Sequence, residues 1–229
     1  MRLAQVLGIA TLCAASLTAT AEHAAATLIT SLQEGVAIDL PAANYHGSEA
    51  QQVVPGVTWS STASGSVFGY SSIYGFASNG TWSGLNMAGL NSAAGTMTFA
   101  FATPVDGVGG YLNYAPELGL TPTIAVYDAG MNLLESATLS FNTGRGWNSG
   151  SFFGFQGDSD ISFFALSGAY IGITDLTVSS ELLLAELQGQ TAPILLQEVQ
   201  PAPVPEPSSF LLFGAGLLGV ALFRRRSRG

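Results

Sequence analysis

Residues 95–101 read Gly-Thr-Met-Thr-Phe-Ala-Phe, and large apolar side chains alternate in this stretch with small or polar ones. The large side chains, Met97, Phe99 and Phe101, occupy every second position and would all point to one face of a strand. Such alternation is typical of a strand with one face in a core and the other facing outward. The stretch therefore predicts a half-buried strand and favours a β fold for the chain around it.

Short strand patterns continue on both sides of this stretch. They are separated by Gly-, Asn- and Asp-containing turns, such as Asp128-Ala129-Gly130 and Gly157-Asp158-Ser159-Asp160. Many short strands at intervals of about 8 to 12 residues indicate an all-β fold, and we expect an antiparallel β-sandwich of the jelly-roll type. The predicted strands cover residues 27–32, 36–40, 105–114, 123–127, 133–141, 152–155, 161–166 and 170–178.

Two of these strands carry signs of irregular backbone. Gly107, Gly109 and Gly110 crowd the strand at 105–114, which indicates a bulge or a close approach of another backbone. In the last strand the apolar pattern slips between Ile173 and Leu176, which predicts a bulge near Asp175.

The region 56–95 is rich in small polar residues and contains spaced aromatic residues. Five of these fall at even positions, so an unbroken strand would place them in one row. Such a row could stack on sugar rings, but aromatic residues of this kind more often fill the core of a sandwich. The five are Phe68, Tyr70, Tyr74, Phe76 and Trp82.

The N-terminus has the pattern of a secretory signal peptide. Arg2 is followed by an uncharged apolar run at 3–17, and Ala19-Thr20-Ala21 fits the small-x-small cleavage pattern. We therefore expect residues 1–21 to be removed and the mature chain to begin near Glu22. Cys13 would leave with this peptide, so the mature protein would have no disulfide.

The C-terminus has three unlike parts in succession. Pro205-Glu206-Pro207 is followed by an uncharged apolar run at 210–223, which predicts one hydrophobic helix. A basic tail comes last, and the positive-inside rule places it in the cytoplasm. The run is short for a membrane span, as a processing signal can be. The tail contains Arg224, Arg225, Arg226 and Arg228.

The arrangement at 204–229 resembles the PEP-CTERM sorting signal of Gram-negative bacteria. The resemblance implies export through the inner membrane, a transient stay there, and recognition by an exosortase that removes the tail. It also implies a location at the cell surface or in an extracellular, exopolysaccharide-containing biofilm matrix. Residues 126–130, 152–155 and 171–178 are similar to strands of the jelly-roll-type domains that often precede this signal. Residues 22–180 would then form the exported domain, and 181–203 a short helix and Pro-containing linker.

The charge of the exported part excludes one class of partner. Fourteen of the 15 acidic residues lie between the two terminal signals, whereas Arg145 is the only basic residue there and lysine is absent. The net charge of this part is therefore near −13. Nucleic-acid binding requires basic patches that neutralise phosphate, so we expect no nucleic-acid partner.

Motifs for catalysis are absent from the sequence. No G-x-S-x-G, H-E-x-x-H or P-loop occurs, and we expect a non-enzymatic surface or matrix protein without a cofactor. A carbohydrate-binding module for exopolysaccharide is the first alternative, and a secreted glycan-active enzyme is the second. Asp158 and Asp160 share the predicted turn after Gly157, where two carboxylates can coordinate Ca²⁺ or simply form a solvated acidic turn.

Overall fold

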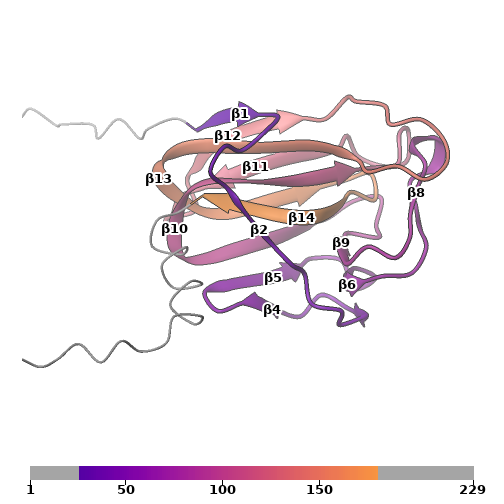
Figure 1. Ribbon diagram of the computed structural model, residues 1–229, viewed down its shortest axis with the longest axis horizontal. Coiled ribbons are helices and arrows are strands. Elements are labelled where there is room, and N and C mark those ends of the chain that lie inside the picture. The colour runs from indigo at the N-terminus through magenta and orange to yellow at the C-terminus, as the bar shows by residue number, and fades with distance from the viewer. Residues whose placement is uncertain (1–25, 180–229) are drawn as a thin grey trace, which may run out of the picture. The chain divides into compact units, whose positions relative to one another are not determined.

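The computed structural model describes residues 26–179 (Figure 1). The predicted signal peptide, linker and C-terminal segment lie outside the described residues. No helix within 26–179 is long and apolar enough to span a membrane. The elements are β1 (Thr27–Ile29), β2 (Val36–Ile38), β3 (Tyr45–His46), β4 (Gln51–Val54), β5 (Val57–Ser61), β6 (Val67–Tyr70), β7 (Tyr74–Gly75), the 3-10 helix η1 (Ala77–Asn79), β8 (Thr81–Trp82), β9 (Met87–Gly89), β10 (Thr96–Asn113), β11 (Thr123–Tyr127), β12 (Leu133–Thr138), β13 (Ser151–Ser167) and β14 (Gly172–Ser179).

Two long strands, β10 and β13, pair antiparallel along most of their lengths and hold the domain together. Their register shifts between Ala100 and Val105 and again between Val105 and Gly107. At these shifts both strands bend, as Figure 1 shows at the end of the domain near their labels. Each strand therefore contributes its two halves to different layers.

The first layer runs in the order β4, β5, first half of β10, second half of β13, β11 and β12. The second layer runs β1, first half of β13, second half of β10, β14, β9, β6 and β3. The short strand β2 joins the second layer beside β14. All these pairings are antiparallel, so the predicted all-β antiparallel sandwich is confirmed.

The core lies between the two layers and follows the alternation of the strands. The first-layer half of β10 buries three side chains in this core, as the sequence predicted: Met97, Phe99 and Phe101. Leu112 and Ile173, cross-strand partners in the second layer, belong to the same buried cluster. One apolar cluster therefore joins both layers.

The close backbone approach predicted from the glycines is also confirmed. Gly109 and Gly154 are paired where β10 meets β13. A Cβ on Gly154 would lie 2.2 Å from the carbonyl oxygen of Val108 and 2.5 Å from the Cα of Gly109. No side chain fits between the strands at this point.

The turn predicted at Gly157–Asp160 is wrong. These residues lie inside β13, which runs without interruption from Ser151 to Ser167. The predicted strands at 152–155 and 161–166 are its two halves, and those at 96–101 and 105–114 are likewise halves of β10. Glycine and polar residues can bend a strand as well as end one, and here the partner strand bends at the same place. The hairpin predicted at Asp128-Ala129-Gly130 is confirmed between β11 and β12.

Candidate functional site

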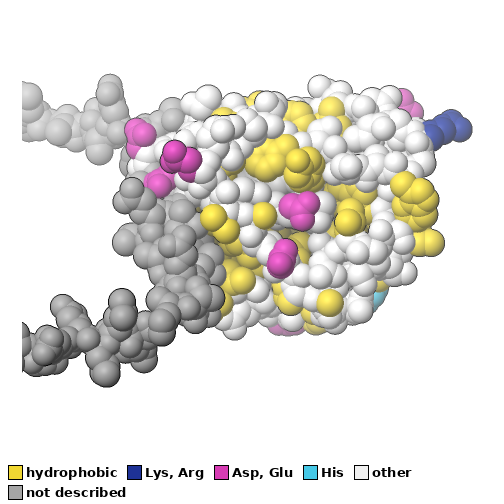
Figure 2. Space-filling view, in the orientation of Figure 1, with side chains coloured by type: hydrophobic (Ala, Val, Ile, Leu, Met, Phe, Trp, Pro, Cys, Tyr) yellow, Lys and Arg dark blue, Asp and Glu magenta, His cyan; other side chains and the backbone are white. Residues whose placement is uncertain are grey.

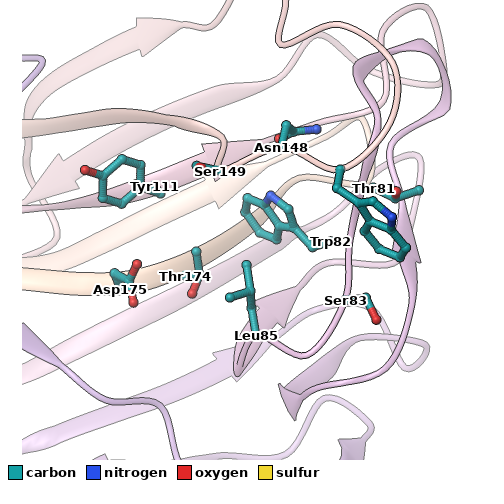
Figure 3. Close-up of a pocket in the computed structure, with 10 residues that line it drawn as sticks. Thr81, Trp82, Ser83, Leu85, Tyr111, Asn148, Ser149, Thr174 and Asp175 are labelled. Carbon is teal, nitrogen blue, oxygen red and sulfur yellow. The ribbon is translucent and has the colours of Figure 1, made fainter.

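An open groove of about 660 Å³ lies beside the second layer (Figure 3), and its volume is in the range of small-molecule binding sites. Thr81, Trp82, Ser83, Leu85, Tyr111, Trp147, Asn148, Ser149, Thr174 and Asp175 line it. Figure 3 shows Tyr111 and Asp175 toward one end and Thr81 toward the other, with Trp82 and Leu85 between them.

The floor of the groove comes from β10 and β14. Tyr111 and Thr174 are direct partners across these strands, so their side chains share one face. Their neighbours Leu112 and Ile173 pair in the same way and are fully buried in the core. The Tyr111 side is therefore the outer face of the second layer, and the Tyr111 ring is 39% exposed there.

Asp175 reaches this outer face through a β-bulge. From Tyr111 to Gly109, β10 advances two residues, while β14 advances three, from Thr174 to Thr177. Asp175 is the extra residue and has a positive φ of 52°. Both Thr174 and Asp175 consequently line the groove. The bulge predicted near Asp175 is confirmed.

The middle of the groove rests on a small second core. Trp82 is 1% exposed and packs edge-on against Phe76, with ring centroids 4.8 Å apart. Tyr74 packs on the other side of this cluster, at 5.0 Å from Phe76, and Met87 completes it. The hairpin of β7 and β8 is thereby fixed to the domain although it forms a separate two-stranded sheet.

The far end of the groove is formed by the loop at 142–150. Trp147 is 66% exposed, while Trp59 and Trp82 are fully buried. The loop runs beside β8, because Trp147 forms an isolated parallel bridge with Thr81 and the Thr81 amide donates to the Gly146 carbonyl at 2.8 Å. Trp147 therefore lies at the Thr81 end of the groove.

Hydrogen bonds to the buried residue Asn79 fix this loop. Its Oδ1 accepts from the Thr143 amide at 3.3 Å, and its carbonyl accepts from the Asn148 Nδ2 at 2.6 Å. The Asn79 Nδ2 in turn donates to the Tyr114 carbonyl at 3.3 Å, which links the loop to the end of β10. The exposed Trp147 is thus carried by a loop with a defined conformation.

The lining combines two exposed aromatic rings with hydroxyl and amide groups. Asp175 is its only ionisable carboxylate. No group of three His, Cys, Asp or Glu that could hold a metal ion occurs among the described side chains. Such a surface can stack on a flat ligand and hydrogen-bond to its hydroxyl groups.

The aromatic row predicted at 68–82 serves the core. Phe68, Tyr74, Phe76 and Trp82 are buried, and only Tyr70 is partly exposed. Of the two interpretations of this row, the core of the sandwich is therefore confirmed, and the sugar-stacking row is not formed by these residues. The glycines and turns between them place their strands in different parts of the fold, so shared parity does not give a shared face.

The remaining predicted site residues fall in two groups. Asp158 is exposed within β13, so the calcium hypothesis no longer has the turn on which it was built. The predicted cleavage site at Ala19 and Ala21 lies outside the described residues, as do the residues of the sorting signal. The sequence interpretation missed the groove itself, although it predicted the bulge near Asp175.

The structure defines an all-β sandwich domain with an open groove. Comparison with protein families shows a PEP-CTERM protein-sorting motif at residues 203–226. This motif indicates a protein that is exported with a C-terminal sorting signal and located at the cell surface or outside the cell. No curated protein matches the chain. The predicted resemblance is confirmed, and the match includes Pro205-Glu206-Pro207 and Arg224 to Arg226.

Proposed function

We propose that this protein is a non-catalytic component of the cell surface or extracellular matrix, delivered by an exosortase-type system, and that its groove binds polysaccharide. The observation that carries the proposal is Trp147. It is the most exposed large apolar side chain in the described part of the chain, it lines a groove, and hydrogen bonds hold its loop. An exposed aromatic ring that lines a groove on a hydrogen-bonded loop is preorganised to stack on a ligand.

Sugar rings match the lining of this groove. Their C–H faces pack on aromatic rings, and their hydroxyl groups pair with hydroxyl, amide and carboxylate groups. Tyr111 at one end and Trp147 at the other offer two ring surfaces, and Asn148 and Ser149 offer polar atoms between them. An extended oligosaccharide lying along the groove would contact both the aromatic rings and the polar atoms.

The carboxylate content of the groove supports binding over hydrolysis. Glycoside hydrolysis commonly uses two carboxyl groups that face each other across the bond to be cleaved. Asp175 is the only acidic residue in the lining. A groove with one carboxylate suits a module that retains a polymer without cutting it.

Binding to immobilised polysaccharides tests the proposal. The exported protein is compared with Trp147→Ala and with Leu120→Ala, which truncates a similarly exposed side chain, 62% exposed, outside the groove. We expect Trp147→Ala to reduce retention by about tenfold or more, as for other stacked aromatic contacts, and Leu120→Ala to leave it unchanged. Equal retention of all three proteins, or release of shortened sugars by the wild type, would contradict the proposal.

A further inference from the structure

We infer that Tyr111 and Asp175 form a subsite that recognises two adjacent hydroxyl groups on an uncharged sugar ring. In this subsite Asp175 determines specificity, and the bulge in β14 positions it. The inference rests on the proposed role of the groove as a polysaccharide site. It adds the chemical class of the sugar and the residue that selects it.

The bulge decides which face of the sheet Asp175 occupies. Residues on a regular strand alternate between faces, so a strand with Thr174 outward would turn residue 175 toward the core beside Ile173. The extra residue resets the alternation: Leu176, which is fully buried, takes the core position, and Asp175 stays on the outer face. Bulges are used in this way to re-aim a side chain at a functional site.

The backbone at Asp175 has a conformation that suits a bulge. Its φ of 52° lies in the left-handed region, which glycine adopts freely and aspartate adopts more readily than most other residues. The bulge can therefore carry an aspartate, and with it a carboxylate, on the outer face of the sheet.

Tyr111 supplies the apolar half of the subsite. Its ring packs edge-on against Phe152 with centroids 5.7 Å apart, which fixes the orientation of the exposed face. Figure 3 shows the Asp175 carboxylate at the same end of the groove as this ring. A sugar stacked on Tyr111 would therefore present the hydroxyl groups at its edge to Asp175.

The chemistry of this pair selects the ligand. An ionised carboxylate only accepts hydrogen bonds, and its two oxygens can accept from two neighbouring hydroxyl groups at once. Arg145, the only basic residue in the exported part, is not in the groove lining. Uronic or sulfated sugars would bring a negative charge to Asp175 within an exported part of net charge near −13. The ligands that fit this subsite are therefore neutral sugars with adjacent free hydroxyl groups.

A set of defined polysaccharides tests this inference on the exported protein. Cello-oligosaccharides, xylan and β-mannan have adjacent free hydroxyl groups along the backbone, laminarin does not, and polygalacturonate adds a carboxylate to each residue. We expect at least one of the first three to bind. Periodate, which cleaves bonds between adjacent hydroxyl-bearing carbons, should abolish that binding, and laminarin and polygalacturonate should not bind.

Variants at position 175 assign the effect to the carboxylate. Asp175→Asn keeps the shape of the side chain, and Asp175→Gly removes it while suiting the backbone conformation. We expect both to lower affinity by about tenfold or more, the effect of losing hydrogen bonds to a charged group. The melting temperature of Asp175→Gly should be no lower than that of the wild type. Asp158→Asn, at an exposed position outside the groove, is the matched control and should bind normally.

The outcomes separate this inference from the proposed function. Full binding by Asp175→Asn, or binding that survives periodate, overturns the subsite while the groove remains a polysaccharide site. Binding of polygalacturonate alone likewise overturns only the subsite, whereas failure of every polysaccharide to bind overturns both. Loss of binding in Trp147→Ala together with Asp175→Asn, but not in Asp158→Asn, supports both.

Discussion

The Nδ2 of Asn148 donates a hydrogen bond to the carbonyl oxygen of Asn79 at 2.6 Å. This bond joins the loop that carries the exposed Trp147 to the residue that ends η1. The Asn113 Nδ2 reaches the same oxygen at 3.0 Å, so β10 and the loop meet at one buried atom. The exposed ring of the groove therefore depends on polar contacts beneath the surface, and the side chains of Asn79 and Asn113 contribute to these contacts from outside the groove lining.

Asn79→Ala should weaken both the fold and the groove. It removes the acceptor of the Thr143 amide and the donor to the Tyr114 carbonyl, and buried groups left without partners cost about 2 kcal/mol of unfolding free energy. Urea unfolding measures this loss. Asn132→Ala, which removes an exposed hydrogen bond within a turn, is the control and should cost much less. Equal midpoints for the two variants would contradict the role given to Asn79.

Gly154→Ala should destabilise the sandwich at the contact between its two long strands. The new methyl group would meet the Val108 carbonyl, and the backbones of β10 and β13 would have to separate. We expect a loss of about 1–3 kcal/mol, as for other overpacked sites. Gly75→Ala is a suitable control, because its nearest neighbour would be 3.8 Å away. A stable Gly154→Ala protein would show that the strands are not packed this closely.

Stability should fall at high pH because of Tyr74. Burial raises the pKa of this phenol far above its usual value near 10, and its oxygen accepts from the Asn91 amide at 2.9 Å. The folded state thus keeps a proton that the unfolded state releases above about pH 10. The stabilising effect is fully present below that pH and is lost as the pH rises toward the raised value.

Unfolding midpoints measured on both sides of pH 10 check the prediction. Tyr74→Phe should be less stable than the wild type at neutral pH, since the Asn91 amide loses its acceptor. Above pH 10 the stability of Tyr74→Phe should decline less steeply with pH than the stability of the wild type. Burial also raises the pKa of Tyr114, so a double variant with Tyr114→Phe should decline least. Parallel curves for all three proteins would refute the assignment.

Alanine at Pro205, Glu206 and Pro207 should block sorting. Proline restricts the backbone and cannot continue a helix, so we expect the two prolines to favour an extended segment that an enzyme can bind. Their loss should trap a form that keeps residues 210–223 in the inner membrane. A tag placed after Gly229 reports processing during cell fractionation. We expect the tag to be lost from the wild type and retained in the variant. Wild-type protein that keeps its tag at the cell surface would show that the segment is a permanent anchor.

The mature N-terminus should lie within a few residues of Glu22. Ala19-Thr20-Ala21 follows an uncharged apolar run, which is the pattern that signal peptidase cleaves. N-terminal sequencing of the exported protein measures this position. Recovery of chains beginning at Met1 outside the cell would show that no signal peptide is removed.

The sequence predicted those parts of the fold that depend on local patterns. The alternation at Met97, Phe99 and Phe101 identified the core strand, and the slip between Ile173 and Leu176 located the bulge. The continuity of β13 through Gly157 could not be predicted from a local pattern. Whether a polar, glycine-containing segment turns or bends depends on what its partner strand does, and the partner lies about 50 residues away in the sequence.

The groove was beyond prediction for a related reason. Tyr111, Trp147 and Asp175 come from three separate segments and are brought together only by the register of β10 with β14 and by the bridge at Thr81. No local pattern records a register between distant strands. The row from Phe68 to Trp82 shows the converse, because equal spacing in the sequence did not place those rings on one surface.

The direction of β14 has a mechanical consequence. The strand begins beside the groove, where Gly172 pairs with Asn113, and ends at Ser179, which pairs with Gly107 next to the bend in β10. A tension between a polymer held at Asp175 and the chain leaving Ser179 would pull along the strand. The hydrogen bonds to β10 and to β2 run across that direction. These hydrogen bonds would therefore be loaded in shear and would share the force. A force directed across the strands would instead break the hydrogen bonds one at a time.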